Sequence, residues 1–316
     1  MKLYKVDITP LSLFKDVPSS YTLFGAISWG YRILYGEEKL KNLLQNFEKN
    51  NPEFLISSIF PRIGNTYYFP KPNLKAKRVD DSNFDYKKLR KVSYIEFDIL
   101  KKVLENEIKN EFQLHEELTK KQIKEKVSLT AKDAIPHASI DRLYNTTEGA
   151  GNFYFEEIVT LKEGYFLIAF NNEDVKKEVV AVFRFLQDIG FGGNRSIGYG
   201  KVIFGEPEPF KEIEKYFYNK TDRFILLSPI IPEKETYEFR NSFYDYFTFR
   251  GAVDNNYDFK DVDIWKEKVI YLKEGSILKV KNPKNFYGQL YLSKSINGKK
   301  IYQYGLAFPL YIQGEQ

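Results

Sequence analysis

The sequence contains no cysteine, one methionine and two histidines among its 316 residues. The absence of cysteine excludes disulfides, thiolate metal sites and cysteine nucleophiles. The two histidines, His115 and His137, leave little material for imidazole catalysis or for a zinc site. There is no run of about 18 apolar residues, and the N-terminal MKLYKVDITP lacks the apolar core of a signal peptide. We therefore expect a cytoplasmic protein without a membrane span.

The composition is that of a folded chain with a slight excess of positive charge. Hydrophobic residues make up 43% of the sequence, and the net charge is +5. A chain of this length can bury a large core and suggests two domains or one large one. The mild positive charge permits a polyanionic partner without requiring one. The aromatic content of 17% leaves rings that could stack on a ligand, although a base-composition bias would also produce it.

Periodicity predicts the regular elements of the first half. Residues 2–11 alternate apolar and polar side chains, as a half-buried strand does. Ser19 or Ser20 can cap a helix whose buried face contains Leu23, Ile27, Tyr31 and Leu34. The segment GYFLIAF is typical of a buried strand. The helix that follows it has a cap at Asn172 or Asp174, a core face of Val175, Val179, Val182, Phe183 and Leu186, and its end at Gly190.

Three further segments predict the domain organisation. The charge-dense region from Asp80 to Val127 indicates a helical insertion with many solvated positions on a smaller core. A hairpin with a polar tip at Asn145 to Asn152 follows it. The two prolines of EPEPF, Glu206 to Phe210, favour a domain boundary, and the sequence beyond them is rich in strands with no clear helix.

Five glycines lie within eleven residues of the stretch DIGFGGNRSIGYGKVIF. The stretch has no Gly-Lys-Ser/Thr ending, and it lies between a helix and a following strand, so it is neither a P-loop nor a dinucleotide-binding turn. Its backbone N–H groups could bind phosphates as a nest does, and Arg195 could add a bidentate contact. We expect Gly193 to need a positive φ. The alternative is a sharp turn with no ligand.

The motif GFGGNRSIGYGKV after an amphipathic helix resembles the glycine-rich loop of the RAMP superfamily of CRISPR proteins. SYTLFGAISWGYRILYGEEKL resembles the first helix of one family in it, SIDRLYNTTEGAGNFYFEEI its thumb hairpin and YQYGLAFPLYI its C-terminal strand. That family is subunit four of the type III-A Csm effector complex. The resemblance implies an α+β fold of two ferredoxin-like (RRM-like) domains. These are residues 1–207, with the insertion (about 80–127), the thumb (about 136–158) and the glycine-rich loop (190–200), and residues 208–316.

The resemblance also implies a function in antiviral defence. The chain would be a non-catalytic subunit that holds the 5′ handle of crRNA, without a cofactor or metal, and binds no DNA on its own. It would dock to the large polymerase-like subunit and lay its thumb against the adjacent backbone RAMP subunit. The implied RNA-binding residues are Ser19, Ser20, Thr22, His137, Ser139, Asp141, Arg142, Gly192, Gly193, Asn194, Arg195, Ser196, Gly198, Tyr199 and Lys201.

The roles of some of these residues stay open. Tyr199, Tyr144 and Phe153 are candidates to stack on bases, but each could equally belong to the core, which we favour for Phe153. Arg142 could contact RNA or only set the hairpin, and Asp141 is better suited to orienting a neighbouring arginine or backbone N–H groups.

Two other functions compete with RNA capping. Some RAMP proteins are metal-independent endoribonucleases that process precursor crRNA, and here His137 is the plausible acid or base. Their general base is typically a histidine near the first helix, and this first-helix region contains none. The third hypothesis is a general module for single-stranded RNA outside CRISPR.

Overall fold

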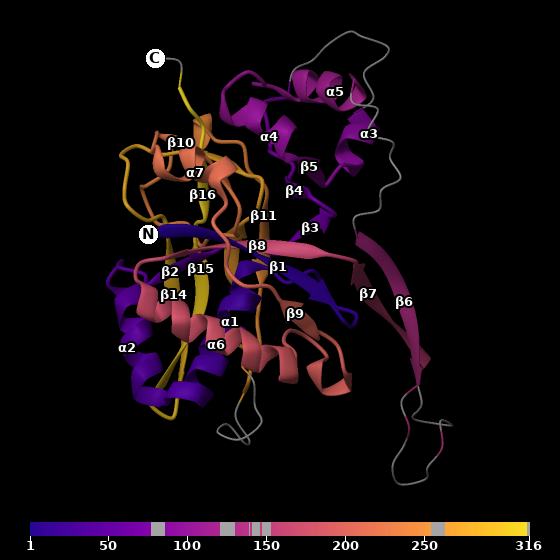
Figure 1. Cartoon of the computed structure of the whole chain (residues 1–316), viewed down its shortest axis with the longest axis vertical. Coiled ribbons are helices and arrows are strands. Elements are labelled where there is room, and N and C mark those ends of the chain that lie inside the picture. The colour runs from indigo at the N-terminus through magenta and orange to yellow at the C-terminus, as the bar shows by residue number, and fades with distance from the viewer. Residues whose placement is uncertain are drawn as a thin grey trace.

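In the computed structural model, the described residues are 1–76, 86–120, 130–138, 140, 146, 153–253 and 263–314. They form a mixed α+β fold in which three helices cover one side of a sheet and a long hairpin projects from it (Figure 1). None of the described helices is both long enough and apolar enough to cross a membrane.

A seven-stranded sheet organises the N-terminal half, with the order β5-β4-β3-β8-β1-β9 and with β2 also paired to β8. Every pairing in it is antiparallel, and β1 and β8 share the longest register, from Lys2 opposite Phe170 to Ile8 opposite Gly164. The predicted buried strand is confirmed, because every residue of β8 is buried. The strands are β1 (Lys2–Pro10), β2 (Phe54–Ile56), β3 (Phe60–Ile63), β4 (Thr66–Pro70), β5 (Tyr94–Glu96), β8 (Gly164–Phe170) and β9 (Val202–Phe204).

The predicted helices are present as α1 (Ser20–Tyr35), α2 (Glu37–Glu48) and α6 (Glu173–Ile189). Ser19 is the N-cap of α1, whose predicted core positions are buried except Leu34, which is 43% exposed in the last turn. The side chain of Asn172 caps α6 by accepting a hydrogen bond from the Val175 N–H at 2.8 Å. Gly190 ends α6 with a φ of 70°, as predicted.

The described part of the region after β4 is helical with many solvated positions, as predicted, but one of its helices also contributes to the main core. It contains α3 (Tyr86–Lys91), α4 (Phe97–Leu104) and α5 (Glu111–Lys120). Four side chains of α4, from Ile99 to Leu104, are buried in the main core, and β5 lies within the large sheet. The sequence of this region did not indicate the packing, because its charge density is high and only one face of α4 is apolar.

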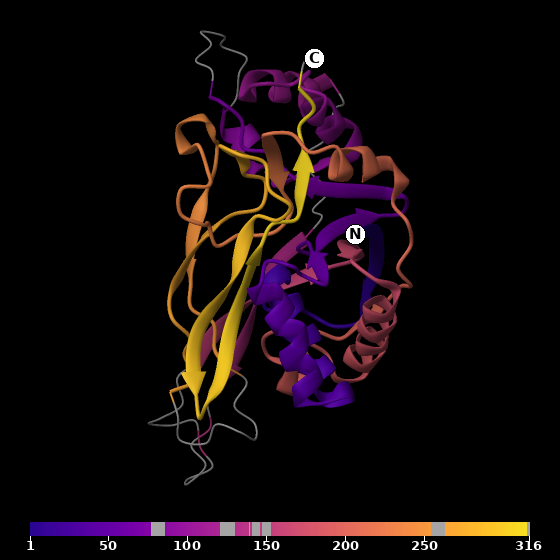
Figure 2. The same cartoon turned by 90° about the vertical axis from the view of Figure 1, so that its left-hand side faces the viewer.

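The C-terminal half is rich in strands, as predicted, and also contains the short helix α7 (Lys211–Tyr218), which the sequence interpretation missed. One hydrophobic core extends through both halves, from Leu3 to Ile312. The strands are β10 (Arg223–Leu226), β11 (Tyr246–Phe249), β12 (Val269–Leu272), β13 (Ile277–Lys279), β14 (Gly288–Ile296), β15 (Lys299–Leu306) and β16 (Pro309–Tyr311). Figure 2 shows the β14–β15 hairpin beside α1 and α2.

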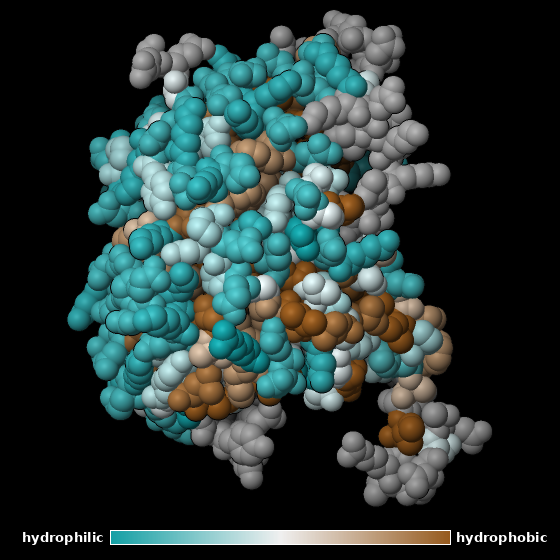
Figure 3. Space-filling view, in the orientation of Figure 1, coloured by the Kyte–Doolittle hydropathy of each residue, from teal (hydrophilic) through white to brown (hydrophobic). Residues whose placement is uncertain are grey.

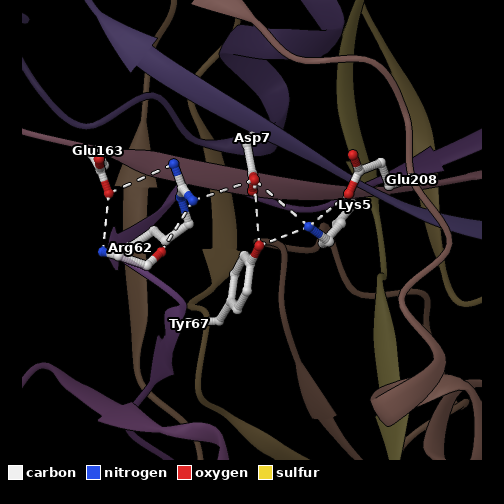
Figure 4. Close-up of polar contacts among 7 residues, drawn as sticks. Lys5, Asp7, Arg62, Tyr67, Glu163 and Glu208 are labelled. Carbon is white, nitrogen blue, oxygen red and sulfur yellow. Dashed lines mark hydrogen bonds and ion pairs between the residues drawn. The ribbon is translucent and has the colours of Figure 1, made fainter.

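A polar network fastens the segment between the halves to the large sheet (Figure 4). Lys5 donates to the Tyr67 hydroxyl at 2.7 Å and pairs with Glu208 at 3.1 Å. Arg62 and Tyr67 both approach Asp7, at 3.5 and 3.3 Å. Burial lowers the pKa of Lys5, but its hydrogen bonds to Tyr67 and Glu208 and the charge of Asp7 outweigh that effect and raise it.

Candidate nucleic-acid interface

A groove of about 1530 Å³ lies between elements of both halves. The segment before α1, the glycine loop at Gly192 and Gly193, the root of the hairpin and residues 242–253 all line it. Six basic and four acidic side chains border it, so positive charge predominates slightly. They are Lys15, Lys71, Arg90, Lys132, Arg250 and Lys273 against Asp16, Glu111, Asp245 and Glu274.

Backbone hydrogen bonds join the two ends of the glycine loop, and its tip is exposed. The Phe191 N–H donates to the Gly200 carbonyl at 3.1 Å, and the Gly200 N–H donates to the Leu13 carbonyl at 2.9 Å. Gly192 and Gly200 have φ values of 91° and 73°. The prediction of a positive φ at Gly193 is wrong, because the left-handed residue at this point is Asn194, with a φ of 61°.

The backbone donors of the loop tip are available to a ligand. Gly192 and Gly193 are exposed and line the groove. Neither N–H has a hydrogen-bond acceptor within the described part of the chain. Unpaired N–H groups at adjacent positions are the donor pattern of an anion-binding nest.

The N-terminus of α1 lies on the same groove. Ser19 and Thr22 are partly exposed there, and the Ser19 side chain makes no capping hydrogen bond. Ser20 is fully buried, and its backbone N–H donates to the Ser58 hydroxyl at 3.1 Å. The prediction that Ser20 contacts RNA is therefore wrong, because the first turn of the helix directs it into the core.

The hairpin, which we call the thumb, is joined to the glycine loop through Glu156. Its strands β6 (Thr130–Ala138) and β7 (Phe153–Leu161) pair along their whole length. One carboxylate oxygen of Glu156 accepts from the Asn194 amide at 2.6 Å and lies 3.6 Å from the Lys15 ammonium. The other lies 3.5 Å from Nε2 of His137. The Asn194 amide predicted to donate to RNA thus positions the loop against the thumb.

The sequence interpretation missed Glu156 because its partners come from positions far apart in the chain. The His137 ring stacks on Tyr154, with centroids 5.3 Å apart and planes at 17°. Its Nε2 is buried and has no hydrogen-bond partner among the residues that the structure describes. The ring is held between Tyr154 and Glu156 and does not line the groove.

Burial distinguishes the alternatives left open for Tyr199 and reverses the one favoured for Phe153. Tyr199 is 9% exposed, so its ring offers no stacking surface, and its role as a stacking residue is not supported. Phe153, which we expected in the core, is 64% exposed and packs edge-to-face on Phe155. The third aromatic candidate, Tyr144, and the site residues Ser139, Asp141 and Arg142 lie outside the described residues.

The remaining predicted residues surround the loop without lining the groove. Ser196, Gly198 and Lys201 are exposed, and Arg195 is partly buried. The groove therefore brings together Ser19, Thr22, Gly192 and Gly193, but not His137, Asn194, Arg195, Ser196, Gly198, Tyr199 or Lys201.

The floor of the groove contains polar residues that no sequence motif indicated. The Ser58 hydroxyl donates to the carboxylate of Glu274. Burial raises the pKa of the Glu274 carboxyl and lowers the pKa of the Lys71 ammonium. Both shifts have the direction that desolvation imposes, because burial disfavours the charged form of each group.

Comparisons with known proteins place the chain in a family. The model of the RAMP superfamily matches residues 17–203. The chain is similar to the "CRISPR system Cms protein Csm4" of Methanocaldococcus jannaschii, at 31% identity over 82% of this chain and 78% of that protein. It is also similar to the protein of the same name from Thermococcus onnurineus, at 28% identity over 99% of this chain and 97% of that protein.

Solved structures share the fold. A chain of the Csm3-Csm4 subcomplex in the type III-A CRISPR-Cas interference complex matches 98% of this chain and 100% of its own length, with a TM-score of 0.64 at 21% identity. A chain of the Csm1-Csm4 cassette in complex with cA4 matches 99% of both chains, with a TM-score of 0.63 at 21% identity.

Proposed function

Because this chain belongs to the RAMP superfamily and, within it, to the Csm4 family, we propose that it is a guide-RNA-binding subunit of a type III-A CRISPR effector complex. It holds the 5′ handle of the crRNA and does no chemistry on it. The observation that carries the proposal is the pair of unpaired N–H groups at Gly192 and Gly193, which open onto the groove beside the N-terminus of α1. A nest and a helix N-terminus together suit consecutive phosphates of a single strand.

The strand order supports a ferredoxin-like N-terminal domain. Around the centre of the large sheet the order is β2, β8, β1 and β9. With α1 and α2 between β1 and β2, and α6 between β8 and β9, this is the antiparallel order of a βαββαβ unit. We place its boundary at residue 207 and propose a second unit in residues 208–316, where α7 packs on a sheet of β13, β10 and β16.

Two protein partners follow from the family. Related proteins occur with Csm1 in one solved structure and with Csm3 in another. The thumb offers an apolar face for the backbone subunit, since Phe153 and Phe155 are 64% and 65% exposed and Pro136 and Ala138 lie opposite them. Figure 3 shows apolar surface on the thumb and over β9, within a largely hydrophilic exterior.

The geometry favours a binding subunit over an endoribonuclease. General acid–base cleavage needs a group within hydrogen-bond reach of the reacting oxygen. Nε2 of His137 is buried beside Glu156 and away from the groove. Labelled repeat RNA incubated with the protein without metal should therefore remain intact. Cleavage that His137→Ala abolishes would favour the endoribonuclease instead.

The RNA-binding proposal is tested by the salt dependence of binding. We expect a labelled handle RNA to bind more tightly than a scrambled RNA of equal length. Lys132→Met, in the groove, should reduce the slope of log affinity against log salt by about 0.7 for one lost phosphate contact. Lys177→Met, on the exposed face of α6, is the matched control and should leave the slope unchanged. Equal slopes for all three proteins would contradict this placement of the RNA.

A further inference from the structure

A second cavity of about 710 Å³ adjoins the groove. It lies between α1, α2 and the β14–β15 hairpin, and it shares Tyr21, Thr22, Gly192 and Phe249 with the groove. We call it the side pocket. Its volume lies in the range of roughly 300–1,000 Å³ that is usual for small-ligand sites. A molecule in the groove thus has a side branch available where the glycine loop meets α1.

A partly buried ammonium lines the side pocket. Lys266 donates to the Tyr302 carbonyl at 2.9 Å, and no carboxylate pairs with it in the described part of the chain. Burial lowers the pKa of Lys266 to about 8. Two of its three N–H donors are left to serve a ligand, and oxygen or ring-nitrogen acceptors of a ligand would compensate the desolvated charge.

Two further polar atoms at the side pocket are unsatisfied. Ser28 Oγ and Gln303 Oε1 are buried and have no hydrogen-bond partner among the described residues. Gln303 is 3% exposed, and its Nε2 is already used by the Glu267 carbonyl and the Ser293 hydroxyl, at 2.9 and 3.2 Å. Buried polar groups are usually paired, so unsatisfied acceptors in the lining that also contains Lys266 favour a polar ligand over an apolar one.

A flat aromatic surface completes the side pocket. Trp29, on α1, is partly buried, lines the pocket and does not belong to the hydrophobic core. The Arg32 guanidinium lies 5.5 Å from the centre of its ring. An aromatic ring flanked by an arginine, next to one donor and one acceptor, is the usual environment of an unstacked nucleobase.

We propose that the side pocket takes one unstacked base of the bound guide RNA, with the base on Trp29 and its polar edge towards Lys266 and Gln303. The inference rests on the proposed function, because the pocket shares part of its lining with the RNA groove. An apolar peptide segment fits less well, since it would leave Lys266, Ser28 and Gln303 unpaired.

Tryptophan fluorescence tests the stacking directly, because Trp29 and Trp265 are the only tryptophans in the chain. Trp265 does not line the pocket, and the arginine 5.7 Å from its ring centre, Arg250, borders the groove, so Trp265 reports binding in the groove and not stacking in the pocket. Titration with handle RNA should strongly quench the emission of Trp265→Phe. It should quench the emission of Trp29→Phe much less. Equal quenching of both variants would overturn the proposal.

Affinity measurements identify the base. Trp29→Ala and Lys266→Met should each weaken handle-RNA binding about tenfold while keeping the wild-type salt slope. Among handle RNAs that each lack one base, one should bind the wild-type protein about tenfold more weakly than the intact RNA does. The same RNA should bind Trp29→Ala no more weakly than the intact RNA does. Thermal melts confirm that the variants fold. Wild-type protein that binds every abasic RNA equally well overturns this inference alone. Wild-type protein that binds no handle RNA overturns the proposed function and this inference with it.

Discussion

Replacing single glycines of the loop by alanine should separate those that shape the loop from those that leave room for RNA. An alanine Cβ at Gly200 would lie 1.9 Å from the Phe191 carbonyl oxygen, at a φ of 73°. Neither strand of the loop can withdraw easily, because the Phe191 N–H bonds the Gly200 carbonyl. A left-handed alanine costs about 1–2 kcal/mol, and overpacking adds roughly 1–3 kcal/mol. We expect Gly200→Ala to lose about 3 kcal/mol of unfolding free energy.

The neighbouring glycines provide graded controls. At Gly198 the φ is 96° but a Cβ would meet nothing within 4 Å, so only the backbone cost of about 1–2 kcal/mol applies. At Gly193 the φ is not positive, and the nearest atom is the flexible Cδ of Lys15 at 3.2 Å. Gly193→Ala should therefore be nearly neutral for folding. Gly193→Val should bind handle RNA more weakly, because its side chain would occupy the groove.

Thermal melts and RNA titrations of the same proteins provide the measurement. For a chain of this length, about 3 kcal/mol corresponds to a decrease in Tm of roughly 4–5 °C, and about 1–2 kcal/mol to roughly 2–3 °C. From the highest Tm to the lowest, the order should be wild type, Gly193→Ala, Gly198→Ala and Gly200→Ala. A Gly200→Ala protein that melts like the wild type would refute the close approach of residues 191 and 200. A stable Gly193→Val protein with wild-type affinity would mean that the loop is a turn without a ligand.

Three further predictions concern the thumb, Lys266 and the apolar face. Glu156→Ala should speed proteolysis of the thumb, because it removes charge-assisted contacts worth roughly 1.5–3 kcal/mol. Glu157→Ala, at the exposed neighbouring position, should not, and equal rates would contradict the link through Glu156. The pKa of Lys266 is lowered from 10.5 to about 8, so folding favours its neutral form and stability increases as pH rises from about 8 to about 10.5. Lys266→Met should therefore raise the Tm at pH 7 and have a smaller effect at pH 10, and an equal effect at both would disprove the desolvation. The double variant Phe153→Ser/Phe155→Ser should reduce co-elution with the backbone subunit while preserving Tm and handle-RNA binding. The control Tyr246→Ser, at a position on β11 that is 68% exposed, should leave co-elution, Tm and binding unchanged. A comparable loss of co-elution with Tyr246→Ser would argue against a specific thumb contact.

The sequence alone determined the elements whose signals are local. The helical stripe of α6, its asparagine cap and its terminal glycine predicted that helix correctly, because all three act within one or two turns. The continuous apolar run of β8 predicted a fully buried strand. The cluster of glycines located a loop that turns sharply, since φ preferences depend on the residue itself.

Tertiary structure decided what each of these segments contacts. Ser19 and Ser20 are equivalent as sequence caps, but only the way α1 packs places one on the groove and the other in the core. Phe153 and Tyr199 have similar local signals, and the projection of the thumb exposes the first while the closing of the loop buries the second. Glu156 acquires its role only when Lys15, His137 and Asn194 meet around it. Such contacts join residues tens to hundreds of positions apart, so no local pattern encodes them.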